Sequence, residues 1–270
     1  APGNSPTELR GLISEPGTLL ASPPLPIIAL PTTSGAGSEV TPFATVWDHV
    51  NRKKLSLASP TLFPRIAIVD PELTDTLPAS STLSSGLDAL NQAFESVWNR
   101  NRSPVTVGLA ARAISLALKA LPRLHTDIDD HSARDELAEA SLLAGLCISQ
   151  TRTAICHSIS YPLTAHFGIS HGVACAFTMG EVFAVCVDQQ PELFDTVTAH
   201  TGHETATELV IDVKKLLASL RVGEAVSRSI GSVDRLTDLT NQMMTPGRSD
   251  NFVLQVDERF IARLITASYR

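Results

Sequence analysis

Short apolar runs separated by turn-forming residues characterise the first part of the chain. Pro26–Leu30 (PIIAL) and the segment Pro64–Asp70 (PRIAIVD), with its apolar run Ile66–Val69, are typical of buried strands. Phe43–Trp47 and Lys54–Leu57 flank the polar segment Asp48–Lys53, which predicts a β-hairpin. We therefore expect this part of the chain to be rich in strands, with loops between them.

From about Leu77 onward the apolar residues follow a helical period. Ser81, Ser84 and Ser85 offer N-caps for the first expected helix. Ser132 with Asp135 approximates a capping box before a long helix that is apolar almost all round, so this helix is expected to be central and buried. The expected helices are Gly86–Trp98, Pro104–Leu121, 133–156, Val173–Val187, Glu192–Ala199, Glu204–Leu220, Val233–Met243 and Glu258–Ser268.

These patterns predict an α/β portion, residues 1–76, followed by an all-α domain, residues 77–270. The front portion is too small for a complete doubly wound sheet, because it supplies two or three strands and no clear crossover helix. Either the fold is unusual or part of it is absent from this sequence.

Charge and hydropathy argue against a nucleic-acid-binding protein and against a membrane span in the early part of the chain. A net charge of −7 with no basic run argues against a nucleic-acid partner. The most apolar early stretch, Leu19–Leu30, is interrupted by three prolines and cannot span a membrane. With no secretory signal at the start, the four cysteines are expected to be reduced and mostly buried in a cytoplasmic protein. Cys156 adjoins His157 and is an alternative metal ligand.

A loop rich in hydroxyls and glycines, PTTSGAGSEVT, follows the first expected strand at residues 31–41. Its backbone N–H groups and the side chains of Thr32, Thr33 and Ser34 could converge on an anion. Gly35 and Gly37 would let a ligand approach closely. The spacing matches no standard nucleotide-binding motif, and a plain polar turn is the alternative.

Three of the eight histidines lie in the stretch HSISYPLTAHFGISHG, residues 157–172. Pro162 and Gly168 are expected to break any single helix here, so the geometry should be two helix ends joined by a turn. His157 and His171, fourteen residues apart, would then point at a common position. Histidine is the commonest metal-binding side chain, although each ring could instead be satisfied separately by hydrogen bonds.

Asp88 and Gln92 are four residues apart on an expected helix and therefore share one face. Such pairs often belong to a solvated helix face. Combined with His157 and His171, they would give a divalent metal two oxygen and two nitrogen ligands, a set that suits Zn²⁺ or Fe²⁺.

Together these motifs resemble the iron-containing (group III) alcohol dehydrogenase family. The resemblance rests on PTTSGAGSEVT, KLSLASPTLFPRIAIVDPELT, GLDAL and the paired histidines, and it runs from about residue 26 to the PGRSDN segment (Pro246–Asn251) and onward. The segments ESVWNRN and SQTRTAICHSISYPLTAHFGISHG are most similar to the phosphonoacetaldehyde reductase branch.

The resemblance implies an incomplete Rossmann-like, dinucleotide-binding domain followed by a helical metal-binding domain, with Asp88, Gln92, His157 and His171 as metal ligands. Gln92 stands where the family carries a histidine, and an amide oxygen binds softer divalent metals less well than imidazole does. Tyr161 stands where many relatives carry a histidine, so it is either a proton donor or a packed aromatic residue.

The resemblance also implies that NADH or NADPH is the second cofactor. Its expected contacts are Thr32, Thr33, Ser34, Gly37 and Lys54. The family's GGGS pyrophosphate loop is absent, as expected if about a hundred N-terminal residues are missing from this sequence.

The implied activity is reversible reduction of an aldehyde to a primary alcohol, with phosphonoacetaldehyde as the expected substrate. Tyr161, His166 or water would supply the proton. Arg152 is the first candidate for binding a phosphonate, ahead of Arg100, Arg102 and Arg248, although each could be an ordinary surface arginine. The alternatives are a general alcohol dehydrogenase of the same family and a catalytically inactive relative kept for an interaction. Relatives are often dimers, so a homo-oligomer is expected.

Overall fold

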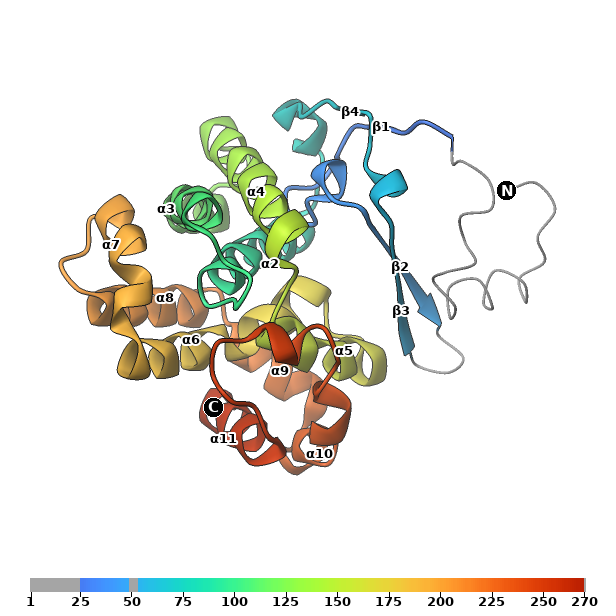
Figure 1. Ribbon diagram of the computed structural model, residues 1–270. Helices are drawn as coiled ribbons and strands as arrows, with labels where there is room; N and C mark the ends of the chain where they lie inside the picture. The colour runs from blue at the N-terminus through green and yellow to red at the C-terminus, as the bar shows by residue number, and fades with distance from the viewer. Residues whose placement is uncertain (1–24, 49–52, 270) are drawn as a thin grey trace.

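Figure 1 shows the computed structural model, which describes residues 25–48 and 53–269. A small β portion lies at one side of a larger helical domain. β1 (Ile28–Ala29) pairs in parallel with β4 (Ile66–Ala67), and β2 (Phe43–Asp48) pairs antiparallel with β3 (Lys53–Ala58). The expected hairpin and both expected strands are therefore present.

The parallel strands differ from the expectation in their burial. Ile28 is 56% exposed and Ile66 is 51% exposed, although their apolar runs predicted buried strands. Within the described residues each strand has a single neighbour, so their side chains meet solvent.

The helical domain follows from residue 79. Its helices are α2 (Ala79–Val97), α3 (Pro104–Thr126), α4 (His131–Thr151), α5 (Ile155–Phe167), α6 (His171–Gln189), α7 (Asp195–Thr201), α8 (Ala206–Ser219), α9 (Val222–Ile230), α10 (Asp234–Thr237) and α11 (Glu258–Ser268). The expected last helix has the bounds of α11, whereas α9 was not expected. The expected helix Val233–Met243 is reduced to α10 and the 3₁₀ turn Thr240–Met243. The division between residues 76 and 77 stays a prediction.

Two helices, α2 and α4, begin at positions that differ from the expected ones. α2 begins at Ala79 after Pro78, so the three serines expected as N-caps lie inside the helix. α4 is capped by Asp130, whose carboxylate accepts a hydrogen bond from the Ala133 N–H at 3.0 Å, so Ser132 also lies within a helix.

The expected helix 133–156 is in fact interrupted. α4 ends at Thr151, and Arg152 adopts φ 60° and ψ 179°, a conformation that does not continue a helix. α5 then carries Pro162 in its interior, where a break was expected. Its packing against α6 outweighs the one hydrogen bond that the proline cannot donate. α5 ends at Gly168, in the left-handed region at φ 67°.

α2, rather than α4, is the central helix. Every residue of α2 from Gly86 to Val97 is buried, whereas Leu146 of α4 is 37% exposed. α2 packs against α3, α4 and α6, and its Phe94 ring lies 4.8 Å from the ring of Phe183 on α6. The polar residues of α2 are therefore held inside the core.

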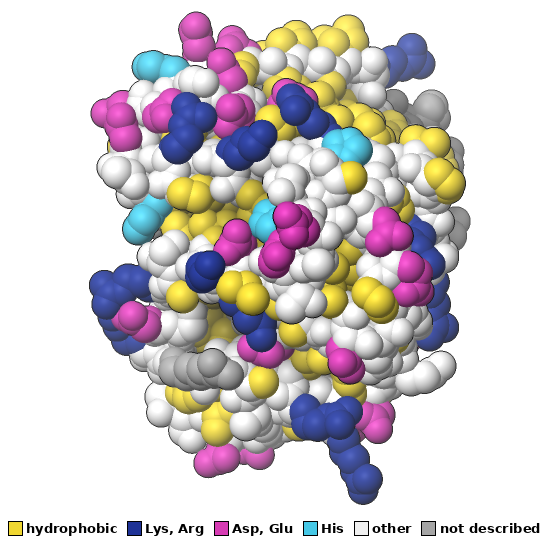
Figure 2. Space-filling model, turned by 90° about the vertical axis from the view of Figure 1, so that its left-hand side faces the viewer, with side chains coloured by type: hydrophobic (Ala, Val, Ile, Leu, Met, Phe, Trp, Pro, Cys, Tyr) yellow, Lys and Arg dark blue, Asp and Glu magenta, His cyan; other side chains and the backbone are white. Residues whose placement is uncertain are grey.

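α3 and α6 are long and apolar enough to cross a membrane by length and composition alone. More than half of the apolar stretch of each helix is buried inside the protein, as in the core helices of many globular domains. Figure 2 shows the side of the molecule on which α3, α7 and α8 lie, with acidic and basic side chains interspersed. A solvent-open cavity of about 480 Å³ is lined by residues of α3 and α8, among them Lys119 and Asp212.

α2 and α6 approach each other closely at Gly172. A Cβ built on Gly172 would lie 1.7 Å from the carbonyl oxygen of Ser84 and 3.1 Å from the backbone nitrogen of Asp88. Glycine is therefore required at the start of α6, and the close approach places His171 beside Asp88.

We expect Gly172→Ala to destabilise the protein by about 1–3 kcal/mol or more, because its methyl group would collide with backbone atoms that cannot rotate away. Gly108→Ala is the matched control. Gly108 lies in α3 with nothing within 4 Å of an added Cβ, and alanine there should be stabilising by up to about 1 kcal/mol. Urea unfolding of both variants measures the difference, and equal stabilities would contradict the assigned contact.

Candidate metal centre

Four side chains that can bind a metal come together from α2, α5 and α6. Asp88 of α2, His157 of α5, and His171 and Cys175 of α6 place their ligand atoms within 4.8 Å of one another. The rings of His157 and His171 lie 5.3 Å apart at an angle of 72°. The two imidazoles therefore do point at a common position, from two helices joined by a short turn.

Helical spacing explains why these residues meet. His171 is the first residue of α6, and Cys175 follows four residues later on the same face. His157 lies in the first turn of α5, and Tyr161 follows four residues later. The Tyr161 ring lies nearly parallel to that of His171, with centroids 6.4 Å apart.

Glu95 holds His157 in place from α2. This carboxylate is fully buried, and it accepts hydrogen bonds from the backbone N–H groups of Ala154 (2.6 Å) and His157 (3.1 Å). Its Oε2 atom also lies 2.8 Å from His157 Nδ1. With Nδ1 donating to Glu95, His157 directs Nε2 toward the cluster, where it lies 3.2 Å from Asp88 Oδ1.

The neighbouring ionisable groups shift the pKa values of His157 and Cys175. Burial lowers the pKa of His157, but the neighbouring Cys175, Glu95 and Asp88 outweigh it and raise that pKa well above its usual value. Burial raises the pKa of the Cys175 thiol, but His157 and His171 outweigh it and bring that pKa down to about 7. The cluster thus favours a thiolate beside the imidazoles.

Gln92 lies one turn after Asp88 on the same side of α2 and is 3% exposed. Its side-chain oxygen is buried and has no hydrogen-bond partner among the described residues. Such an orphaned oxygen, one helical turn from the Asp88 carboxylate, fits a site for a divalent metal. The role of Gln92 as a ligand stays a prediction.

The two candidate proton donors lie in different surroundings. The Tyr161 hydroxyl accepts a hydrogen bond from Arg248 Nε at 3.1 Å, beside the cluster. His166 follows His157 by nine residues, so it lies on the opposite side of α5, about 13 Å along the helix axis. There its Nε2 atom contacts Gln242 Oε1 at 3.0 Å, and the structure does not bring it to the cluster.

The side chains of Arg152 and Arg248 lie in different surroundings. The Arg152 side chain is exposed, whereas its backbone carbonyl accepts a hydrogen bond from Asn99 Nδ2 at 3.2 Å. Arg248, a weaker candidate in the sequence, is partly buried and directly contacts Tyr161.

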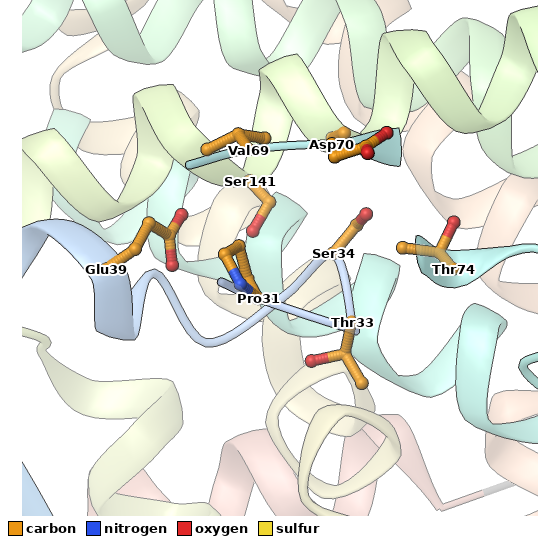
Figure 3. Close-up of a pocket in the computed structure, with 9 residues that line it drawn as sticks. Pro31, Thr33, Ser34, Glu39, Val69, Asp70, Thr74 and Ser141 are labelled. Atoms are coloured by element: carbon orange, nitrogen blue, oxygen red, sulfur yellow. The ribbon is translucent and has the colours of Figure 1, made fainter. Parts of the chain in front are cut away.

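The expected cofactor loop lies at the carboxyl edge of the parallel strand pair. Figure 3 shows Ser34 near Asp70, which follows β4, while the Thr33 hydroxyl points away from Asp70. The cavity between them is about 10 Å³, room for a single water molecule. Burial raises the pKa of the adjacent Glu39, although a hydrogen bond from its own backbone opposes this. The exposed Thr32 and Thr33 fit one edge of a dinucleotide site at such a strand edge, rather than an enclosed pocket.

The two glycines of this loop face helices. A Cβ on Gly35 would lie 2.6 Å from the Ser85 carbonyl oxygen, and a Cβ on Gly37 would lie 2.5 Å from the Cα atom of Gly145. Both glycines therefore allow the loop to pack closely against α2 and α4. A cofactor contact at Gly37 stays a prediction. So does one at Lys54, which lies in β3 with its side chain outside the described residues.

Comparison with known proteins identifies the family. A model of the C-terminal domain of the Fe-containing alcohol dehydrogenase family matches residues 82–240, and an iron-containing alcohol dehydrogenase model matches residues 7–71. The chain belongs to the iron-containing alcohol dehydrogenase family. The expected fold, an α/β portion ahead of a helical domain, is the fold of this family and is confirmed.

Individual relatives support the same assignment. The phosphonoacetaldehyde reductase of Streptomyces viridochromogenes is 40% identical over 160 residues, which are 59% of this chain and 40% of that protein. A probable alcohol dehydrogenase of Escherichia coli, EutG, is 32% identical over 77% of this chain and 53% of its own length. A sulfoacetaldehyde reductase from Bifidobacterium kashiwanohense, solved in complex with NAD⁺, superposes with a TM-score of 0.81 at 31% identity, over 91% of this chain and 65% of that one. The chain thus spans about half the length of the curated relatives.

Two residues of the site were not identified from the sequence. Cys175 is four residues after His171, and the i, i+4 rule that linked Asp88 to Gln92 would also have linked this pair. Glu95 lies seven residues after Asp88 on the same helix face, but its role depends on where α5 begins. That start was hidden by the interruption at Arg152.

We expect Glu95→Gln to lower metal affinity by about 10–100-fold, because an amide cannot accept from both backbone N–H groups and also fix the His157 ring. The affinity is measured by zinc titration, and the stability of the metal-free protein by urea unfolding. Glu139→Gln, which removes an exposed ion pair with Arg112, should change stability by less than about 0.5 kcal/mol. If Glu95→Gln bound zinc as tightly as the unchanged protein, Glu95 would have no role in metal binding and would serve only to cap the start of α5.

Proposed function

We propose that this protein catalyses metal-dependent, NAD(P)H-linked reduction of an aldehyde to a primary alcohol. The observation that carries the proposal is the cluster of Asp88, His157 and His171, in a chain of the iron-containing alcohol dehydrogenase family. The nearby orphaned oxygen of Gln92 supports a metal there.

These residues would hold the metal, which when bound supplies Lewis-acid polarisation of the carbonyl oxygen, while the nicotinamide supplies the hydride. Asp88 and Glu95 both contact His157 and orient its ring. Tyr161 holds a proton at its hydroxyl oxygen beside His171, and we assign proton delivery to it rather than to His166.

We further propose a substrate with an anionic end, phosphonoacetaldehyde, which would be reduced to 2-hydroxyethylphosphonate. Arg248 supports this choice. Its guanidinium group lies one aromatic ring away from His171, and its contacts with Tyr161 and Gly247 use two of its five N–H donors. Guanidinium binds phosphonate or sulfonate oxygens in a bidentate manner. Two of the relatives are a phosphonoacetaldehyde reductase and a sulfoacetaldehyde reductase, named for aldehydes of this kind.

A cytoplasmic location and a homodimer remain part of the proposal. They are supported by the resemblance to the family rather than by any contact in this structure.

The first test is the oxidation of NADH or NADPH by the purified protein across a panel of aldehydes that includes phosphonoacetaldehyde. We expect turnover that EDTA abolishes and Zn²⁺ or Fe²⁺ restores. Turnover of neutral aldehydes alone would favour a general alcohol dehydrogenase. No turnover and no retained metal would contradict the proposed function.

The second test compares two arginines. Arg248→Met should raise the KM for phosphonoacetaldehyde about tenfold to a hundredfold, because a hydrogen bond to a charged group is worth about 1.5–3 kcal/mol. The KM for propanal, a neutral aldehyde, should change little. Arg152→Met is the control and should behave as the unchanged protein toward both aldehydes. The reverse outcome would restore Arg152 as the phosphonate-binding residue.

A further inference from the structure

We propose that the Cys175 thiolate is a ligand of the metal centre and completes a set of four with Asp88, His157 and His171. The inference rests on the metal site of the proposed function and changes its composition. It assigns the fourth ligand position to Cys175, for which Gln92 is the other candidate.

The geometry of the cluster supports a four-ligand site that includes sulfur. Four ligands bound to zinc at about 2.0–2.3 Å lie about 3.3–3.8 Å apart in a tetrahedron. The ligand atoms of these four residues already lie within 4.8 Å of one another. Cys175 Sγ lies 3.8 Å from the ring nitrogens of His171, close to the spacing that two ligands of one ion require. A contraction of about 1 Å would close the site around an ion.

The other cysteines do not share this position. Cys156 precedes His157 by one residue, so its side chain is turned by about 100° around α5. Cys186 lies near the other end of α6, and burial alone raises the pKa of its thiol. Among the cysteines that the structure describes, only Cys175 belongs to a group of metal-binding side chains.

A thiolate changes the ions that the site prefers. Soft sulfur ligands favour Zn²⁺ over harder cations, whereas an amide oxygen in the same position would favour hard ones. The set of one carboxylate, two imidazoles and one thiolate therefore predicts a zinc-selective centre. Metal binding would release the thiol proton, because a coordinated thiol is deprotonated.

The test is X-ray absorption at the zinc edge of the zinc-loaded protein. We expect one sulfur neighbour per zinc at about 2.3 Å, retained in Cys186→Ser and in Gln92→Leu and lost in Cys175→Ser. Cys175→Ser should also bind zinc at least about tenfold more weakly, because removing a residue that merely holds a ligand in place already costs about that much.

The spectrum of the unchanged protein is decisive even if a variant fails to fold. Zinc bound by nitrogen and oxygen neighbours alone, at about 2.0–2.2 Å, would overturn the role of Cys175 while leaving metal-dependent reduction intact. Loss of zinc in Gln92→Leu with full retention in Cys175→Ser would assign the fourth position to the amide and overturn the proposal. A protein that binds no zinc, iron or cobalt would overturn both this inference and the proposed function.

Discussion

The buried carboxylate of Glu95 is the interaction on which both the helical domain and its site depend. An ionised group in a core is tolerated only when its oxygens are fully hydrogen-bonded, and Glu95 meets this condition through the backbone of Ala154, the backbone of His157 and the His157 ring. α5 has no side-chain cap of its own, so Glu95 satisfies its first N–H groups from another helix. The same contacts fix the tautomer of a candidate metal ligand. Fold and site are thus joined through one side chain.

Close contacts at glycines set the distances that the site requires. α6 can bring His171 and Cys175 beside Asp88 only because Gly172 lets its first turn touch the backbone of α2 at Ser84. Gly37 and Gly145 do the same for the loop after β1 and for α4. At each of these glycines, the methyl group of an alanine would push apart the two elements that meet there.

The periodic features of the sequence predicted most of the architecture. Two strand-forming segments on either side of a polar segment predicted the hairpin of β2 and β3, and helical spacing predicted most of the helices, because these signals are local. The interruption at Arg152 could not be predicted, since it depends on side chains from distant segments. The convergence of His157 and His171 was indicated by their short spacing in the sequence. The role of Glu95 was missed because its partners lie about sixty residues away in the chain. Half-exposed β1 and β4 show the converse, because an apolar run predicted burial although each strand has a single neighbour among the described residues.

The backbone of Arg152, rather than its side chain, contributes to the site, because its conformation ends α4 just before α5 begins. A residue other than glycine in this region costs about 1–3 kcal/mol and persists only when surrounding contacts impose it. Three asparagines do so, because their amide groups donate to the carbonyls of residues 151, 152 and 153 at 3.3, 3.2 and 2.8 Å. Two of them follow α2, and the third, Asn251, belongs to the segment that also presents Arg248 to Tyr161. The segment that would bind the anionic end of the substrate therefore also secures the turn that delivers His157 to the metal centre.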